Sequence, residues 1–458
     1  MTSSVSKSSI FPFENLPLEM QLQVISHLDI PELASASVAS INCYILANDR
    51  STWATVIENI GLKNLEGKNV SEKKQKIKKI HELEKLYFPE VIEKPITIEN
   101  TIETLRKTNE IKIRDTLKIW EKIYEQAEHI AGKPAIEIPK FDELKKSTDK
   151  KYIRQAFAKW INNNKDNFNL TELDLRISGL LYLPKEIGNL AQLQLLDLSS
   201  NKLTSIPMEI GNLSQLEQLN LSYNNLSDIP KELWSLPQLK ELYLSGNKLT
   251  SIPKEIEKLV QLQVLDLSNN KLTSIPKEIG NLLQLQELYL SGNKLTSIPK
   301  EIGNLSQLER LDLHNNKLTS IPKEIGNLSQ LEQLNLYNSK LTSIPKEIGN
   351  LSQLEQLNLS YNNLTYIPKE IGNLSQLRRL YLSGNKLTYI PKEIGSLSQL
   401  ALLDLRNNSI SYYPDCLDRL TNTKIIDSNI LIAHEVIRFL GGHIAHHLYN
   451  KIYGPITY

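Results

Sequence analysis

The chain has 458 residues, of which 40% are apolar and 23% charged, with a formal net charge of +1. These ordinary values predict neither nucleic acid nor an anionic membrane as a partner. The two cysteines, Cys43 and Cys416, imply no disulfide framework and suit a reducing compartment. No apolar run approaches the ~18 residues of a membrane span, and the N-terminus lacks the apolar core of a secretory signal. We therefore expect a cytoplasmic location.

Residues 1–60 have the pattern of a small helical module. Pro17 suits the first turn of a helix, in which Val24, Ile25 and Leu28 form one apolar stripe. Asp29 is a favourable N-cap for a second helix that Pro31 would open.

This segment resembles the F-box, a family of helical modules that bind a Skp-type adaptor protein. The positions that match, and that the resemblance implies for adaptor binding, are Leu16, Pro17, Glu19, Ile25, Leu28, Leu33, Val38 and Trp53. The sequence departs from the family where an aromatic residue usually follows the valine, because Asn42-Cys43-Tyr44 stands there with a one-residue offset. A generic three-helix cap is the alternative interpretation.

Residues 61–169 have charged, helix-favouring stretches in which Ile111, Leu117, Trp120 and Tyr124 follow helical spacing. We interpret them as a helical spacer that ends in an N-terminal cap, since no heptad pattern persists long enough for a coiled coil. Basic side chains outnumber acidic ones here, which is more typical of a solvated helical surface than of a nucleic-acid site.

Residues 170–422 contain eleven copies of a 23-residue repeat. Prolines from Pro184 to Pro414 recur every 23 residues, and every copy has seven apolar positions, all Leu or Ile except Tyr413. Two alternating leucines, such as Leu196 and Leu198, predict a short strand with Asp197 pointing outward. The proline then turns the chain, and stacked copies bury their leucines against one another. An asparagine at the ninth position, such as Asn201, can bond backbone groups at the bend, and Ser339 replaces it in the eighth copy.

This pattern resembles the leucine-rich-repeat family. It implies an α/β solenoid with a curved parallel sheet of eleven strands, about 50 Å long, preceded by an all-helical N-terminal region. Bacterial ubiquitin ligases of this family carry a catalytic Cys-x-Asp, and Cys416-Leu417-Asp418 fits that string. However, Cys416 occupies an ordinary repeat position, acidic residues flank it, and too few residues follow for a catalytic domain.

The outward strand positions on the concave face are candidates for binding a protein partner. Tyrosine and arginine anchor interfaces more often than most side chains. The candidate residues are Tyr223, Tyr243, Tyr289, Arg310, His314, Tyr337, Tyr361, Arg379 and Tyr381. We expect the hot spot in the central stretch of the array. Simple duplication of repeats is the alternative explanation for any single one of them.

Residues 423–458 break the repeat, and we expect a helical C-terminal cap that covers the last coil. His443, His446 and His447 lack a companion carboxylate or cysteine set, so we expect no metal there, and no other motif implies a cofactor.

Taken together, the resemblances imply a non-enzymatic F-box/leucine-rich-repeat protein. In that family the F-box binds the adaptor of a cullin–RING ubiquitin ligase, and the repeats hold a protein substrate. The near-identical repeats and the helical spacer are similar to those of chlamydia-like intracellular bacteria, which implies an effector acting in a host cytoplasm. The alternative is a repeat scaffold that binds small GTPases or other signalling proteins.

Overall fold

The computed structural model describes residues 98–127, 136–411, 414, 417 and 419–427. The F-box-like segment, Cys416 and the residues after 427 lie outside this range, including the expected cap helix and its histidines. The chain divides into two compact units, Met1–Arg114 with Thr148–Lys150 and Asp115–Ser147 with Lys151–Tyr458. In the first unit the structure describes mainly the beginning of helix α6 (Ile98–Gln126).

The second unit begins with a helical cap around an aromatic cluster. It contains the rest of α6, the short helix α7 (Phe141–Leu144) and most of α8 (Lys150–Asn164), which continues into η3 (Lys165–Asn167). The Trp120 ring lies 5.7 Å from Phe141, 5.3 Å from Phe157 and 5.6 Å from Trp160. All except Phe141 are buried. Because such rings bury large apolar areas, they hold the helices together beside the first coil.

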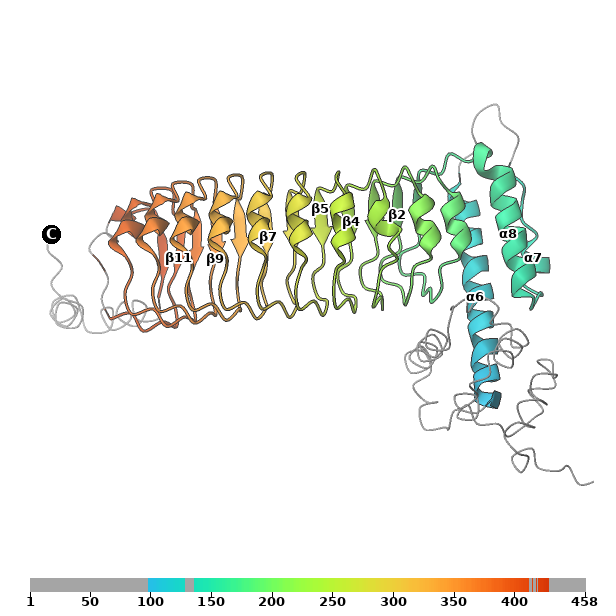
Figure 1. Ribbon diagram of the computed structural model, residues 1–458, viewed down its shortest axis with the longest axis horizontal. Coiled ribbons are helices and arrows are strands. Elements are labelled where there is room, and N and C mark those ends of the chain that lie inside the picture. The colour runs from blue at the N-terminus through green and yellow to red at the C-terminus, as the bar shows by residue number, and fades with distance from the viewer. Residues whose placement is uncertain (1–97, 128–135, 412–413, 415–416, 418, 428–458) are drawn as a thin grey trace, which may run out of the picture. The chain divides into compact units, whose positions relative to one another are not determined.

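The solenoid is one parallel sheet of twelve short strands, each paired with the strands before and after it in sequence. The strands lie along one long side of the unit and one-turn 3-10 helices along the other (Figure 1). The strands are β1 (Glu172–Asp174), β2 (Leu195–Asp197), β3 (Gln218–Asn220), β4 (Glu241–Tyr243), β5 (Val264–Asp266), β6 (Glu287–Tyr289), β7 (Arg310–Asp312), β8 (Gln333–Asn335), β9 (Gln356–Asn358), β10 (Arg379–Tyr381), β11 (Leu402–Asp404) and β12 (Lys424–Ile426).

A 3-10 helix follows the proline in the first ten coils, because proline fixes φ and cannot donate a hydrogen bond to a sheet. The proline is the extended N-cap, as at Pro207 with φ −66° and ψ 147°, except in η6, where Glu232 is the N-cap. The helices are η4 (Lys185–Asn189), η5 (Met208–Asn212), η6 (Leu233–Ser235), η7 (Lys254–Lys258), η8 (Lys277–Asn281), η9 (Lys300–Asn304), η10 (Lys323–Asn327), η11 (Lys346–Asn350), η12 (Lys369–Asn373) and η13 (Lys392–Ser396).

The leucines and isoleucines between the sheet and the 3-10 helices form one continuous core. Leu196, Leu198 and Ile210 of one coil are fully buried, and the same positions are buried along the array. Each buried side chain of this size contributes roughly 1.5–3 kcal/mol relative to exposure, which a single coil could not obtain.

Asparagine at the ninth position links neighbouring coils through its side-chain amide, as the sequence predicts. In Asn201 the amide donates to the carbonyls of Leu175 and Leu198, and its oxygen accepts the N–H of Leu180. Ser339 is too short to make these bonds, and its buried hydroxyl has no hydrogen-bond partner within the described residues. The amide ladder is therefore interrupted in the eighth coil.

Two side chains of α6 close the N-terminal end of the solenoid. The Gln126 amide donates to the carbonyl of Asp174 and accepts its N–H, at 2.8 and 2.9 Å, as a neighbouring strand would. The buried carboxylate of Asp115 accepts the N–H groups of Leu181 and Tyr182 at 2.7 and 2.9 Å. These bonds satisfy backbone groups that the first coil would otherwise leave unpaired.

At the C-terminal end, the structure corrects the expected boundary between the array and a helical cap. Residues 424–426, which we expected in the cap, form a twelfth strand that pairs with β11. The N–H of Leu405 donates to the carbonyl of Ile426, and the N–H of Lys424 donates to that of Ala401. The unpaired edge of β11 is satisfied in this way, and two β-branched isoleucines suit a strand.

Candidate protein-binding surface

The candidate partner-binding residues lie in coils three to ten of the sheet, on or just after its strands. In a strand such as Glu241–Tyr243 the middle residue is buried in the core and the outer two are partly exposed. The outer two side chains point away from the leucines because alternate strand residues face opposite sides. We call this solvent-facing side of the strands the sheet face.

Most aspartates and asparagines at the end of the strands are bound to their own coil. Asp197 accepts the N–H of Ser199 at 2.8 Å, and Asn220 accepts that of Ser222 at 3.0 Å. The same bond recurs at Asp174, Asp266, Asp312, Asn335, Asn358 and Asp404. These side chains point outward as the alternation predicts, but their carboxylate or amide oxygens are already bound to the backbone. They stabilise the turn after the strand.

Tyrosine replaces the turn-stabilising residue in three coils, at Tyr243, Tyr289 and Tyr381. A tyrosine side chain cannot accept a bond from its own coil in this way. In these coils the residue three positions later is Gly246, Gly292 or Gly384, with φ between 65° and 68°. Other coils place Ser, Asn, Tyr or Ile at that left-handed position. Glycine adopts positive φ without steric cost, so it maintains the turn where the tyrosine gives no support.

Tyr243 and Tyr289 form similar pairs with a glutamate of their own strand. The Tyr243 hydroxyl donates to Glu241 at 2.8 Å, and the Tyr289 hydroxyl donates to Glu287 at 2.6 Å. Arg310 of the next strand donates to the other oxygen of Glu287 at 3.0 Å. Burial is the main cause that raises the pKa of both tyrosines above its usual value, and the neighbouring carboxylate raises it further. These rings are therefore held upright in fixed positions on the sheet face.

A chain of aromatic rings crosses the seventh, eighth and ninth coils. The His314 ring lies 6.5 Å from Tyr337, which lies 5.3 Å from Tyr361 in an edge-to-face arrangement. His314 and Tyr337 occupy a column that is serine in neighbouring coils, where hydroxyls such as those of Ser245 and Ser222 bond to each other at 3.1 Å. Nδ1 of His314 lies 2.8 Å from the Asp312 carboxylate. This chain of rings lies where the residues of the central coils differ from the repeat sequence of their neighbours.

Tyr223 and Tyr361 are left-handed residues with φ 55° and 56°, and they are 61% and 49% exposed. A methyl group on Gly246 would come within 2.7 Å of Cδ1 of Tyr223, and one on Gly384 within 3.0 Å of Cδ1 of Tyr361. Each ring therefore lies against the glycine of the following coil. These exposed aromatic surfaces are held in place by backbone geometry as well as by packing.

The candidate residues follow one another along the coils, and direct contacts link some of them. Tyr243, Tyr289 and Arg310 form the first group, and the aromatic chain of His314, Tyr337 and Tyr361 follows directly. Tyr223 lies one coil before the first group. Arg379 and Tyr381 lie on β10, where Arg379 donates to Gln356 of β9 at 3.2 Å. The central coils thus carry the largest share of the candidate surface.

Sequence analysis missed a groove of about 650 Å³ at the C-terminal end of the array. Its lining includes Tyr366 and Tyr389, which are 41% and 48% exposed, and the prolines of their coils. In coils four to eight, serine stands at the position that Tyr366 and Tyr389 occupy in coils nine and ten. This change from serine to tyrosine could have indicated the groove from the sequence.

Among the described residues, no group of three or more His, Cys, Asp or Glu side chains is placed to hold a metal ion. No helix in the described part of the chain is long and apolar enough to cross a membrane.

Family comparisons agree with this geometry. The model described as leucine-rich repeat region matches residues 224–317 and 276–380, and the leucine rich repeat model matches residues 168–226 and 375–427. The F-box domain model matches residues 13–55. The chain therefore belongs to the leucine-rich-repeat proteins, and its N-terminal module makes it an F-box/leucine-rich-repeat protein. Both families are typically non-enzymatic protein-interaction modules, so the architecture is that of an adaptor-like protein.

Several solved structures are similar to the repeat array. A leucine-rich-repeat protein of Leptospira interrogans is 35% identical over 59% of this chain and 86% of its own, with a TM-score of 0.39. The functional domain of InlJ from Listeria monocytogenes is 26% identical over 56% of this chain and 53% of its own, with a TM-score of 0.50. The plant peptide hormone receptor RGFR1, solved with RGF2, is 34% identical over 54% and 45%, with a TM-score of 0.46. No curated protein matches the chain.

Proposed function

We propose that this protein recruits a substrate to a cullin–RING ubiquitin ligase. In this proposal the F-box segment binds a Skp-type adaptor, and the sheet face of the repeats binds the protein to be modified. The observation that carries the proposal is the presence of both modules in one chain, an F-box match over residues 13–55 and a described repeat array with aromatic side chains on its sheet face.

The sheet face has the properties of a protein interface. Its central coils present Tyr289, Arg310 and Tyr337, and these residue types supply much of the binding energy in protein complexes. Their positions are held by the Glu287 hydrogen bonds and by the ring contact to Tyr361. Because such pre-organised side chains lose little entropy on binding, the central coils are the part of the array best suited to a partner.

The first test is calorimetry of the full chain with a purified Skp-type adaptor. Leu16 and Pro17 are the matched F-box positions at the start of the expected first helix. We expect binding in the micromolar range or tighter, and a loss of at least about tenfold in the double variant Leu16→Ala/Pro17→Ala, because apolar contacts dominate such helical docking. Thermal unfolding of the repeat array serves as the control and should not change.

The opposite result would favour a different class of function. If the wild-type chain binds no Skp-type adaptor at tens of micromolar, the ligase proposal fails. A scaffold that binds small GTPases or other signalling proteins through the repeats would then be the better account. Action as an effector in a host cytoplasm stays a prediction.

A further inference from the structure

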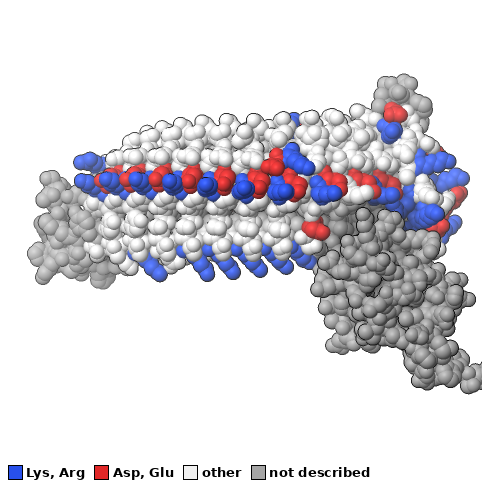
Figure 2. All heavy atoms as spheres, viewed as in Figure 1, with Lys and Arg blue, Asp and Glu red and all other residues white. Residues whose placement is uncertain are grey.

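The edge of the solenoid that follows the C-terminal ends of the strands carries a column of lysines. They occupy the tenth position of five consecutive coils, directly after the buried residue of the ladder position, which is asparagine in four of these coils and Ser339 in the eighth. We call them the edge lysines: Lys248, Lys271, Lys294, Lys317 and Lys340. Four are exposed and Lys248 is half-buried. Figure 2 shows a row of blue side chains along the lower edge of the array.

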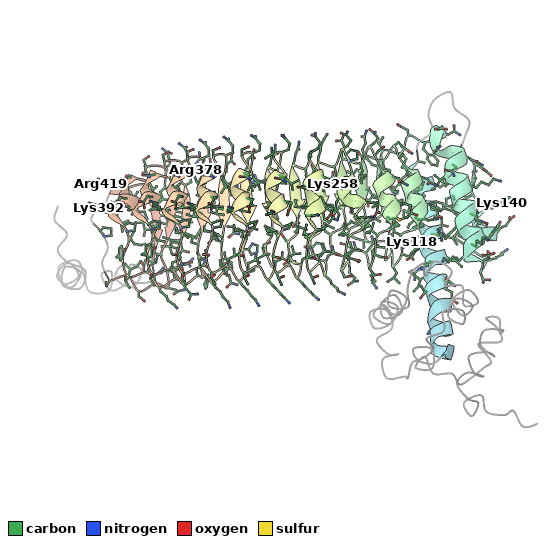
Figure 3. The ribbon with its side chains drawn as sticks, viewed as in Figure 1. Lys118, Lys140, Lys258, Arg378, Lys392 and Arg419 are labelled. Carbon is green, nitrogen blue, oxygen red and sulfur yellow. The ribbon has the colours of Figure 1, made fainter. Side chains whose placement is uncertain are left out.

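No acidic residue stands within four positions of any edge lysine in the sequence, whereas a glutamate directly follows each lysine that opens a 3-10 helix in these coils. Among the described residues, neither group of lysines forms an ion pair. The exposed side chains that accompany them in each coil are threonine and serine, such as Thr250 and Ser251. On the 3-10 helices, Lys254 is followed by Glu255, and the same pair recurs in the next four coils. Figure 2 shows a row of alternating blue and red along the face toward the viewer, and Figure 3 labels Lys392, which opens η13, near one end of the array.

At the N-terminal end of the column, Lys248 lies close enough to Lys271 for their positive charges to interact. The pKa of Lys248 lies below its usual value, mainly because of partial burial and also because of the positive charge of Lys271. Like charges repeated at the strand spacing of about 4.8 Å repel one another, and they would be stabilised by a ligand with negative charges at a similar spacing.

We propose that the edge lysines bind an acidic helix of a protein partner. Five lysines one coil apart span about 19 Å. Carboxylates placed one per turn on an α-helix repeat every ~5.4 Å, so five of them span about 22 Å. The flexible four-carbon stem of lysine accommodates the small difference.

Other polyanions fit this edge less well. Single-stranded nucleic acid is usually held by aromatic side chains between the cations, whereas the polar residues directly beside the edge lysines are glycine, asparagine, threonine and serine. Aromatic rings come near the column only in coils seven and eight, at His314 and Tyr337. A membrane surface would favour apolar side chains that insert beside the cations, and these edge positions are polar. The edge lies beside the sheet face and shares no residue with it, so the inference does not depend on the proposed function.

Two other coils show that asparagine fits the fold at the position of the edge lysines. Asn225 and Asn363 occupy the same position in coils three and nine, and their N–H groups make the same bond to the preceding coil as Lys248 does. An edge variant therefore replaces the five edge lysines with asparagine. The control, which we call the convex variant, changes the 3-10 helices of the same coils instead. It replaces Lys254, Lys277, Lys300, Lys323 and Lys346 with asparagine and so removes the same amount of charge.

The experiment titrates the full chain with a fluorescent, alanine-rich helical peptide that carries one glutamate per turn over about five turns, at about 50 mM salt. We expect the wild type to bind, the convex variant to bind within about twofold of it, and the edge variant to bind at least about tenfold more weakly. Absence of peptide binding by the wild type, or equal losses in both variants, would overturn the proposal. The proposal would also be overturned if polyuridylate RNA or phosphatidylserine vesicles bound the wild type more tightly than the peptide does, and if the edge variant lost that binding. Thermal unfolding checks that both variants are folded.

Discussion

The ring of Tyr361 lies over Gly384 of the next coil, so that a methyl group on this glycine would come within 3.0 Å of Cδ1 of the ring. Both residues have positive φ, 56° for the tyrosine and 68° for the glycine. Tyr223 and Gly246 repeat the arrangement near the other end of the array. The glycine thus meets two requirements, a left-handed backbone and space for the ring of the preceding coil.

The change Gly384→Ala should lower the free energy of unfolding by about 1–2 kcal/mol, because alanine is strained at positive φ and its methyl group displaces the ring. Urea unfolding followed by circular dichroism measures this loss. In a Tyr361→Ala background the steric part of the loss should disappear. An equal cost of Gly384→Ala in both backgrounds would show that the ring is not held against the glycine.

Restoring the missing amide of the ladder should stabilise the array. The change Ser339→Asn supplies the donor and acceptor that nine other coils have at this position, and each net hydrogen bond contributes about 0.5–1.5 kcal/mol. We therefore expect a gain of about 1–3 kcal/mol in the free energy of unfolding. The reverse change Asn293→Ser in an intact coil should lose a similar amount. A destabilising Ser339→Asn would mean that the eighth coil has adapted its backbone to serine.

Removing the N-terminal cap should have a large effect. In Asp115→Ala, the N–H groups of Leu181 and Tyr182 lose their shared acceptor, and unsatisfied buried donors cost about 1–3 kcal/mol each. We expect the free energy of unfolding to fall by about 2–4 kcal/mol. Glu125→Ala on the same helix removes only a surface pair with Lys122 and should change it by less than about 0.5 kcal/mol. Similar losses in both variants would contradict the capping role.

Stability should fall at high pH through the partly buried hydroxyls of Tyr243 and Tyr289. The pKa of Tyr243 and Tyr289 is raised in the folded protein, above a usual value of 10.0. The unfolded chain therefore loses these protons at lower pH, so their contribution is complete below pH 10 and decreases as the pH rises further. Urea unfolding should show a shallower decline above pH 10 in Tyr243→Phe/Tyr289→Phe than in the wild type. Parallel declines would contradict this linkage.

Much of the fold follows from the spacing of prolines and leucines, because a 23-residue repeat with inward leucines leaves little choice of register. The tyrosines were identified as outward residues for the same reason. A helical N-terminal cap was expected, but its hydrogen bonds were not, since the contact of Asp115 with Leu181 joins residues far apart in sequence and leaves no local pattern. The role of Asp197 and its equivalents was missed because an outward aspartate looks the same whether it binds a partner or its own backbone.

The central claim is that one chain links a ligase adaptor to a protein held on the sheet face. The most direct measurement immobilises the Skp-type adaptor and asks whether it retains a eukaryotic protein only through this chain. Tyr289→Asn and Tyr337→Ser place residues that other coils already carry at these positions, so both should remain folded. We expect wild-type chain to bring the same partner to the adaptor repeatedly. The immobilised adaptor should still retain the tyrosine variants, but their affinity for the partner should be about thirtyfold lower. The double variant Leu16→Ala/Pro17→Ala should lose both, and convex Lys254→Ala/Glu255→Ala should lose neither. Retention of the partner by the tyrosine variants, or its loss in the convex variant, would contradict the account.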